Sequence, residues 1–305
     1  MLFSKIKNSA VLIAIVGIVL FSAKAIMVKL AYQYNVSSLH LLLFRMLFSL
    51  PFYLIILYFQ KSKSTTNIKK QDYLWLLFFG FIGYYLASYF DFLGLQYIKA
   101  GLERIILFVY PTLVLLISRV FLKERISPKQ IIAILITYFG VIITFSGELQ
   151  YNGDHIFLGG FLIFLSALTY ASYLVGSGWL IPKFGVLRFT SYAMIISSVC
   201  VIIHYLIFDR TSVFQYSYQV YLLGFMMAIL STLIPSFLVS LAIKKIGASN
   251  FSIIGSIGPI STIILAYIFL DERLTIMQLL GAVIVIIGIT FVSLNKSKKN
   301  RKLVP

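Results

Sequence analysis

Long apolar runs separated by short polar segments make up this chain. Residues 131–145 and 279–292, for example, are almost continuously apolar over a length that approaches a membrane-spanning helix. Strands of a membrane barrel would instead alternate apolar with polar residues, which these runs do not do. The pattern predicts an all-α integral membrane protein with ten transmembrane helices, at residues 11–32, 38–59, 73–94, 99–119, 129–146, 156–178, 187–208, 218–241, 250–269 and 276–294.

Composition agrees with a membrane protein and excludes a sizeable soluble domain. Hydrophobic residues make up 60% of the 305 positions and charged residues 11%, whereas a soluble globular chain has ~45–50% and ~25%. The longest polar gap between the predicted spans, residues 60–71, is too short to fold as a domain. The chemistry of this protein must therefore reside within the membrane.

The N-terminus imitates a cleavable signal peptide. Lys5 and Lys7 precede the apolar run 10–21 and a small-residue triplet at 23–25. The apolar pattern continues past this triplet to Ala31, however, and the sequence therefore favours an uncleaved first span.

Basic residues cluster in the segments between the spans and give the chain its net charge of +17. With a cytoplasmic N-terminus, nineteen Lys and Arg residues lie in cytoplasmic segments and three in external ones. This asymmetry follows the positive-inside rule. It argues against a nucleic-acid partner, which would need the charge on one soluble face. The chain is predicted to lie in the cell (inner) membrane with both termini cytoplasmic, Asn67 and Asn300 inside and Asn152 outside.

The chain also contains an internal repeat. Adding 148 to the residue numbers of the fourth and fifth spans aligns them without a gap on the ninth and tenth. Because each half then holds an odd number of spans, the halves are expected to be inverted. The predicted organisation is a first five-helix repeat over 1–147, an external connection over 148–154, a second repeat over 155–295 and a basic cytoplasmic tail over 296–305. The matched residues include Pro111 with Pro259, Glu124 with Glu272, Arg125 with Arg273, Gln130 with Gln278 and Gly140 with Gly288.

Several of the matched residues have structural interpretations. Glu124 and Glu272 fall in tight hairpins at the membrane faces, where a helix-end role is favoured over contact with substrate. Residues 127–130 and 275–278 each fit a helix N-cap followed three residues later by Gln. Gly140 and Gly288 would permit close helix packing.

Two prolines are candidates for helix breaks. Pro111 and Pro259 lie within the fourth and ninth spans, where each removes a backbone hydrogen bond and frees a carbonyl. Such a break either shapes helix packing or lines a substrate cavity, and the sequence leaves both interpretations open.

The first half carries charged side chains inside its predicted spans. An ionised group at the membrane centre costs ~2.5–3.5 kcal/mol on insertion scales, so such groups indicate function or buried pairing. Lys29 lies near enough to the interface to reach water. The substrate-binding candidates are Lys24, Arg45, Asp91, Glu103 and Arg104, with Tyr84 and Ser88 on the helix face of Asp91.

The positive excess of this group favours a pocket for a carboxylate or another anionic group. Arg45 is the predicted principal anchor, because its planar fork makes two hydrogen bonds to a carboxylate and keeps its charge. The alternative is a structural pair in which Arg45 only neutralises Asp91. Asp91 or Glu103 could carry a coupling proton or serve as a fixed counter-ion.

Two five-helix halves, the spaced Pro, Glu-Arg, Gln and Gly residues that end each half, and Arg45 in the second span resemble the EamA-type ten-helix transporters of the drug/metabolite transporter superfamily. The resemblance covers nearly the whole chain and is strongest over 94–147 and 242–295. It implies an inner-membrane carrier that exports amino acids and other small metabolites without an attached ATPase. Residues 101–104, Gly-Leu-Glu-Arg, depart from the uncharged fourth span of many relatives, so the resemblance does not extend to a particular substrate.

The inverted repeat predicts a secondary transporter of small polar metabolites such as amino acids, working by alternating access, with export favoured. An uptake carrier or facilitator is the alternative within transport. The predicted partners are the small-molecule substrate and the lipid bilayer, and a coupling proton is left open. Neither a cofactor nor a metal is expected, and the oligomeric state stays open. The chain is not expected to be an enzyme. The alternative of another class is an intramembrane serine protease with Ser177 and His204, although Val175 replaces the glycine of that motif.

Overall fold

The computed structural model describes residues 2–60, 68–122, 128–149, 155–209, 211–255 and 257–301. Within these ranges the chain is almost entirely helical and contains no strand. Seven of the described helical segments are long and apolar enough to cross a membrane, and three shorter apolar helices accompany them. The prediction of an all-α membrane protein with about ten spans is confirmed.

Each half of the chain contributes eight helical elements in the described ranges. Where one element follows another without a loop between them, the two belong to the same span. The first half holds α1 (Leu2–Tyr32), α2 (Ser38–Phe59), α3 (Lys70–Gly80), the π-helix η1 (Phe81–Leu86), α4 (Ala87–Tyr97), α5 (Ala100–Leu107), α6 (Tyr110–Leu122) and α7 (Pro128–Leu149). The second half holds α8 (Ile156–Phe184), α9 (Val186–Phe208), α10 (Tyr218–Ala228), the π-helix η2 (Ile229–Leu233), α11 (Ile234–Ile246), α12 (Ala248–Ile254), α13 (Ile257–Leu270) and α14 (Ile276–Arg301).

The helix bounds of the two halves correspond at the offset of 148. Helix α10 repeats the bounds of α3, and the π-helices η1 and η2 begin at the equivalent residues Phe81 and Ile229. The short helices α5 and α12 likewise begin at Ala100 and Ala248. The residue pattern revealed this offset only in the last two spans of each half, whereas the helix bounds extend it to the third and eighth spans.

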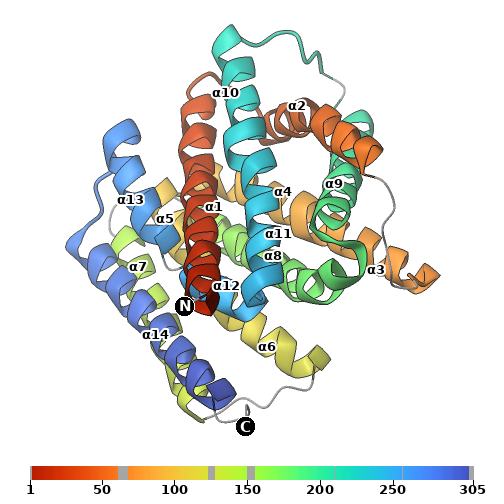
Figure 1. Ribbon diagram of the computed structural model, residues 1–305. Helices are drawn as coiled ribbons and strands as arrows, with labels where there is room; N and C mark the ends of the chain where they lie inside the picture. The colour runs from red at the N-terminus through yellow and green to blue at the C-terminus, as the bar shows by residue number, and fades with distance from the viewer. Residues whose placement is uncertain are drawn as a thin grey trace.

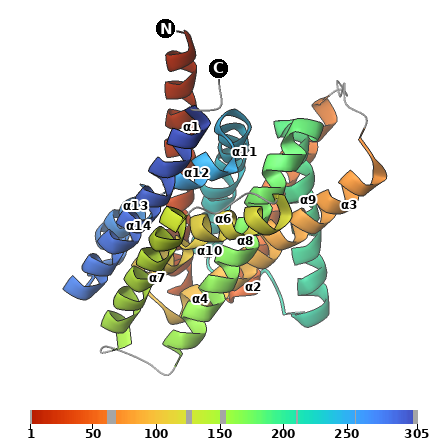
Figure 2. The same ribbon diagram turned by 90° about the horizontal axis from the view of Figure 1, so that it is seen from below.

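The two halves exchange their first helices. Helix α1 packs against α11 and α13 of the second half, and α8 packs against α4 and α6 of the first. Helix α2 packs against α9, and α7 lies beside α14 in both views (Figure 1, Figure 2). Every one of these contacts has its counterpart under the offset, as a two-fold relation between the halves requires.

The surface and the interior differ in polarity as a lipid environment demands. Large apolar side chains such as Leu135, Phe139 and Ile142 are exposed on the outside of α7. Hydroxyl residues such as Ser166 and Thr190 are buried between the helices, and each makes a hydrogen bond to a neighbouring helix. Because lipid offers no hydrogen bonds, polar side chains find their partners inside the bundle.

Glycine permits the close contact of α7 with α14. A Cβ atom on Gly281 would lie 2.6 Å from the carbonyl oxygen of Gly140 and from the backbone nitrogen of Thr144. Gly140 was predicted to serve close packing, and it lies at this contact. Its neighbour Gly281 was not singled out from the sequence, because a lone glycine in an apolar run gives no periodic signal.

Candidate substrate site

Helices α1, α4 and α5 bring four of the predicted charged residues together. The Nζ atom of Lys24 lies 2.7 Å from Oδ2 of Asp91, and both side chains are almost completely buried. Glu103 is fully buried, and its electrostatic neighbours are Asp91, Lys24 and Arg104. The charges that lie far apart in the sequence therefore form one buried cluster in the first half.

Arg104 connects this cluster to the second half through two hydroxyl groups. Its Nη2 donates a hydrogen bond to Oγ of Ser22 at 2.9 Å. Ser22 Oγ accepts a second hydrogen bond, also at 2.9 Å, from Ser261 of α13. The guanidinium also lies over the ring of Phe21, 5.6 Å from its centroid.

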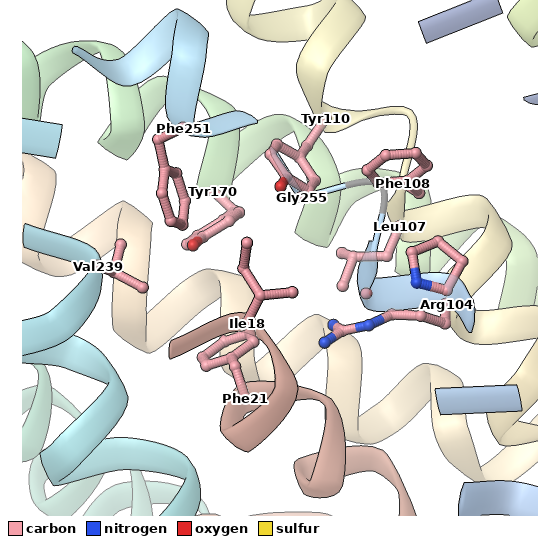
Figure 3. A pocket seen from close by; sticks show the side chains of 12 residues that line it. Ile18, Phe21, Arg104, Leu107, Phe108, Tyr110, Tyr170, Val239, Phe251 and Gly255 are labelled. Atoms are coloured by element: carbon pink, nitrogen blue, oxygen red, sulfur yellow. The ribbon is translucent and has the colours of Figure 1, made fainter. Parts of the chain in front are cut away.

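A small cavity lies between the halves beside this arginine. It is lined by Ile18 and Phe21 of α1, Arg104 of α5, Tyr170 of α8 and the first turn of α13, and the guanidinium extends toward the α1 side chains (Figure 3). Its volume is about 30 Å³, room for only a few water molecules, since one water needs ~10–15 Å³. In this conformation the site is closed around a space smaller than an amino acid.

An adjoining cavity of about 20 Å³ shares Phe21 and Tyr170 with the first. It is lined by Lys24, Tyr84 and Ser88, so three more of the predicted site residues lie next to the central cavity. Together, the two small cavities are lined by hydroxyl residues and by the cations Arg104 and Lys24.

Arg45 does not line this second cavity but contacts Ser88, which does. Its Nη2 donates to Ser88 Oγ at 2.8 Å, and its Cζ lies 5.1 Å from the centroid of the Phe92 ring. Among the residues that the structure describes, its Nε has no hydrogen-bond partner. Among the described ion pairs, Asp91 is joined to Lys24, and none joins it to Arg45. Arg45 therefore reaches the cavity only through the Ser88 hydroxyl.

Lys29 and Tyr32 fix the end of α4. Lys29 donates to the carbonyl oxygens of Leu95 and Ile98 at 3.2 and 3.1 Å, and the Tyr32 hydroxyl donates to the carbonyl of Phe92 at 2.6 Å. A cation at a helix C-terminus satisfies carbonyls that have no partner within the helix. This contact gives Lys29 a structural role.

Both broken spans meet at the central cavity. Helix α5 ends at Leu107 and α6 begins at Tyr110, so Pro111 lies in the first turn of α6. Helix α12 ends at Ile254, and Pro259 lies in the first turn of α13 and lines the cavity. Proline is tolerated in a first turn, because its missing N–H would have no partner there in any case.

Glycine at the second break makes room for a tyrosine. The Tyr110 hydroxyl occupies the space into which a Cβ atom on Gly255 would project. Tyr110 and its repeat partner Gly258 both line the cavity, as do Leu107 and its partner Gly255. The cavity thus lies where equivalent positions of the two halves face each other.

At the hairpin between α13 and α14, Glu272 contacts the first half. Its two carboxylate oxygens accept hydrogen bonds from the backbone nitrogens of Ala100 and Gly101, at 3.1 and 3.2 Å. The carboxylate therefore caps the N-terminus of α5. The equivalent Glu124 lies outside the residues that the structure describes.

The residues of the hydrolase alternative have other partners. Ser177 donates to the carbonyl of Tyr173 at 2.7 Å, and Nδ1 of His204 lies 2.9 Å from the Tyr85 hydroxyl. In the described part of the chain these two side chains share no hydrogen bond. The geometry gives no support to a catalytic dyad.

Sequence reasoning missed Ser22, Tyr170 and Ser261. Hydroxyl residues are common in transmembrane helices, and their apolar surroundings gave no periodic signal. The repeat could have indicated one of them, because Tyr170 is the partner of Ser22 under the offset of 148.

Comparisons with known proteins agree with this architecture. The sequence model of the EamA-like transporter family matches residues 8–146 and 157–294. The chain is 30% identical over 305 residues to YcbK, an uncharacterized transporter of Bacillus subtilis (strain 168), with 98% of each chain covered. It is 26% identical to YyaM, an uncharacterized transporter of the same strain, over 77% of this chain and 78% of the relative. One solved crystal structure shares the fold, with a TM-score of 0.69 at 15% identity over 95% of this chain and 98% of the other.

Proposed function

Because the chain belongs to the EamA-like transporter family and is a membrane transporter, we propose that it is a secondary carrier that exports small polar metabolites bearing an anionic group, such as amino acids. In this proposal the two halves are inverted repeats that rock against each other, and the cavity between them opens alternately to the two sides of the membrane. The direction of transport rests on the resemblance to metabolite exporters.

The observation that carries the proposal is the position of Arg104 in the cavity between the halves. A guanidinium binds a carboxylate through two parallel hydrogen bonds and stays charged where water is scarce. The first turn of α13 lines the same cavity, and the N-terminus of a helix attracts negative charge. Broken helices in transporters offer their N-termini to anionic substrate groups in this way.

We assign the anchor to Arg104 in place of Arg45. Arg104 lines the cavity directly, whereas Arg45 bonds to Ser88 and packs on Phe92. Lys24 lines the adjoining cavity, and its pairing with Asp91 orients it there. Because Asp91 balances its charge, Lys24 supplies hydrogen-bond donors near the substrate without a second net positive charge.

Alternating access requires the site to open to each side of the membrane in turn. Two features, one at each end of the helix bundle, bear on this opening. A larger cavity of about 300 Å³ lies between α3, α6 and α8, lined by Trp75, Phe79 and Trp179. The positive-inside rule assigns that end to the cytoplasm. At the predicted external end, the Glu272 cap on α5 holds the halves together. The cap accounts for closure at the external end, whereas the larger cavity shares no lining residue with the two central cavities.

Mass spectrometry of the medium from cells that overproduce the protein tests this function. A carboxylate-bearing metabolite is expected to accumulate outside, and Arg104→Gln should reduce that accumulation roughly 10- to 100-fold at equal protein level. Arg273→Gln is the matched control, because the Arg273 side chain is largely exposed. Depletion of a metabolite from the medium would instead establish uptake. A solute altered during passage through proteoliposomes would reveal an enzyme.

A further inference from the structure

The larger cavity between α3, α6 and α8 has a chemistry unlike that of the substrate site. Its volume is about 300 Å³, and its walls are mostly apolar and aromatic, among them Trp75 of α3, Phe121 of α6 and Trp179 of α8. Ser172 adds a hydroxyl group, which donates to the carbonyl of Leu168 in its own helix at 2.9 Å. An ordered water needs ~2–4 polar partners, so a cavity with these walls is a poor site for water.

The cavity opens on the surface of the protein that faces lipid. Trp75, Phe78, Phe121 and Trp179 line it and are also exposed at the surface. In Figure 1, α3 and the end of α6 lie at the edge of the helix bundle. Around a membrane span the medium at such a surface is hydrocarbon. The acyl chains of the bilayer are therefore in position to enter the cavity.

Both tryptophans of the chain lie at this cavity. Trp75 is five residues from the start of α3 at Lys70, and Trp179 is five residues from the end of α8 at Phe184. With a rise of 1.5 Å per residue, each is ~7–8 Å from its helix end, a depth close to the membrane interface, where tryptophan is enriched. Their ring centroids are 5.9 Å apart. The cavity thus opens near the boundary between lipid headgroups and acyl chains.

Three lysines lie at the same end as the tryptophans. Nζ of Lys183 is 4.3 Å from the centroid of the Trp179 ring and 2.6 Å from Oδ1 of Asp72. The exposed side chains of Lys69 and Lys70 stand at the start of α3. These three ammonium groups outnumber the carboxylate of Asp72. Basic pockets between helices on the cytoplasmic side of a membrane bind anionic lipid headgroups.

The internal repeat shows that the fold itself requires neither the tryptophans nor the lysines. Under the offset of 148, the equivalents of Trp75 and Trp179 are Leu223 and Ala31. The equivalents of the three lysines are uncharged, namely Ser217, Tyr218 and Asn35. The combination of tryptophans and lysines is therefore specific to the predicted cytoplasmic end.

We propose that this cavity binds an anionic phospholipid of the cytoplasmic leaflet. One acyl chain enters the cavity beside Trp75 and Trp179, and the phosphate lies near Lys69, Lys70 and Lys183. The cavity shares no lining residue with the two central cavities. The lipid site is therefore separate from the substrate site, and its test does not depend on the solute that is carried.

Tryptophan fluorescence of the full-length protein in vesicles tests the site, because both tryptophans of the chain line the cavity. Bromine atoms on an acyl chain quench tryptophan at short range. Brominated phosphatidylglycerol in phosphatidylcholine vesicles should reach half-maximal quenching at a mole fraction roughly 5- to 30-fold lower than brominated phosphatidylcholine does. Equal quenching curves for the two lipids overturn the proposal.

Removal of the excess positive charge tests the headgroup contact. Lys69→Gln combined with Lys70→Gln should move the phosphatidylglycerol curve onto the phosphatidylcholine curve. The matched control is Lys244→Gln combined with Lys245→Gln, two exposed lysines in the last turn of α11, and it should keep the preference. An equal loss of preference in both double variants would mean attraction by net charge alone and would overturn the site.

Filling the cavity tests the position of the acyl chain. Ser172→Phe places a ring inside the cavity and should reduce quenching by both brominated lipids. Leu168→Phe, one turn earlier on α8 and not a lining residue, is the control. If Ser172→Phe does not fold, Val175→Phe fills the cavity from the next turn. Unreduced quenching in the folded variant would place the lipid on the outer surface and overturn the assignment to the cavity.

Discussion

At the scale of single residues, the buried charges are organised by partners that lie far away in the sequence. The pattern along the chain identified Lys24, Asp91, Glu103 and Arg104 as candidates because charge is rare in apolar spans. It did not determine which cation faces which carboxylate. That choice depends on how α1, α4 and α5 are rotated about their axes, and helix rotation is set by contacts between helices. A pair of Asp91 with Arg45 was only the alternative to a substrate-binding Arg45, and the structure pairs Asp91 with Lys24.

The pair of Lys24 and Asp91 is expected to contribute strongly to stability. Lys24→Met leaves Asp91 buried without a partner, and breaking a buried pair costs ~3–5 kcal/mol. Thermal unfolding in detergent should therefore show a marked fall in Tm for Lys24→Met and recovery in Lys24→Met combined with Asp91→Leu. Lys183→Met is the control, because its pair with Asp72 at 2.6 Å is partly exposed and worth only ~0.2–1 kcal/mol. A double variant as unstable as the single one would refute the pairing.

At the scale of helices, the sequence predicted the ends of the helices better than the contacts between them. The N-cap expected at residues 275–278 is present, because Thr275 N donates to Gln278 Oε1 and Gln278 N donates to Thr275 Oγ1. Its counterpart at 127–130 includes Ser127, which lies outside the described residues. Caps are local, so a few neighbouring residues suffice to predict them. The contact of Glu272 with α5 joins opposite halves and could not be read from a local pattern.

Substitution at the contact between α7 and α14 should separate these helices. Gly281→Ala places a methyl group against Gly140 and Thr144, and overpacking of this kind costs ~1–3 kcal/mol. The expected result is a lower Tm in detergent. Gly178→Ala is the matched control, since its Cβ would meet only the Ala248 side chain at an ordinary 3.7 Å. Equal Tm values for the two variants would show that the helices are not in close contact.

Removal of the Glu272 cap should loosen the predicted external end. Glu272→Ala leaves the backbone nitrogens of Ala100 and Gly101 without their acceptor. In a Cys200→Ser background, Ser261→Cys near the cavity should then react faster with a membrane-impermeant thiol reagent added from outside. Arg273→Ala serves as the control. An unchanged reaction rate in the Glu272 variant would argue that this contact does not restrict access.

At the scale of the whole molecule, charge asymmetry and the repeat predict the orientation in the membrane. Nineteen basic residues in the predicted cytoplasmic segments against three outside give a strong insertion bias. Residues 67 and 152 lie outside the described ranges, and residue 300 lies near the end of α14.

Cysteine labelling checks this orientation directly. In a Cys200→Ser background, an impermeant reagent added to intact cells should modify Asn152→Cys and leave Asn67→Cys and Asn300→Cys unmodified. All three should react after the membrane is permeabilised, which controls for protein level. Labelling at position 67 in intact cells would overturn the inverted arrangement of the halves.

The sequence alone determined that this protein lies in the membrane, that it has about ten spans and that a capping motif such as the one at residues 275–278 begins a helix. These properties follow from local physics, since lipid requires apolar length and internally satisfied backbone groups within each span. Tertiary structure alone decided that Arg104 lines the central cavity, that Arg45 bonds to Ser88 and that Glu103 is buried near Asp91 with no hydrogen-bond partner in the described part of the chain. Such contacts join residues on different helices. They depend on the rotation and packing of entire elements, which no local periodicity encodes.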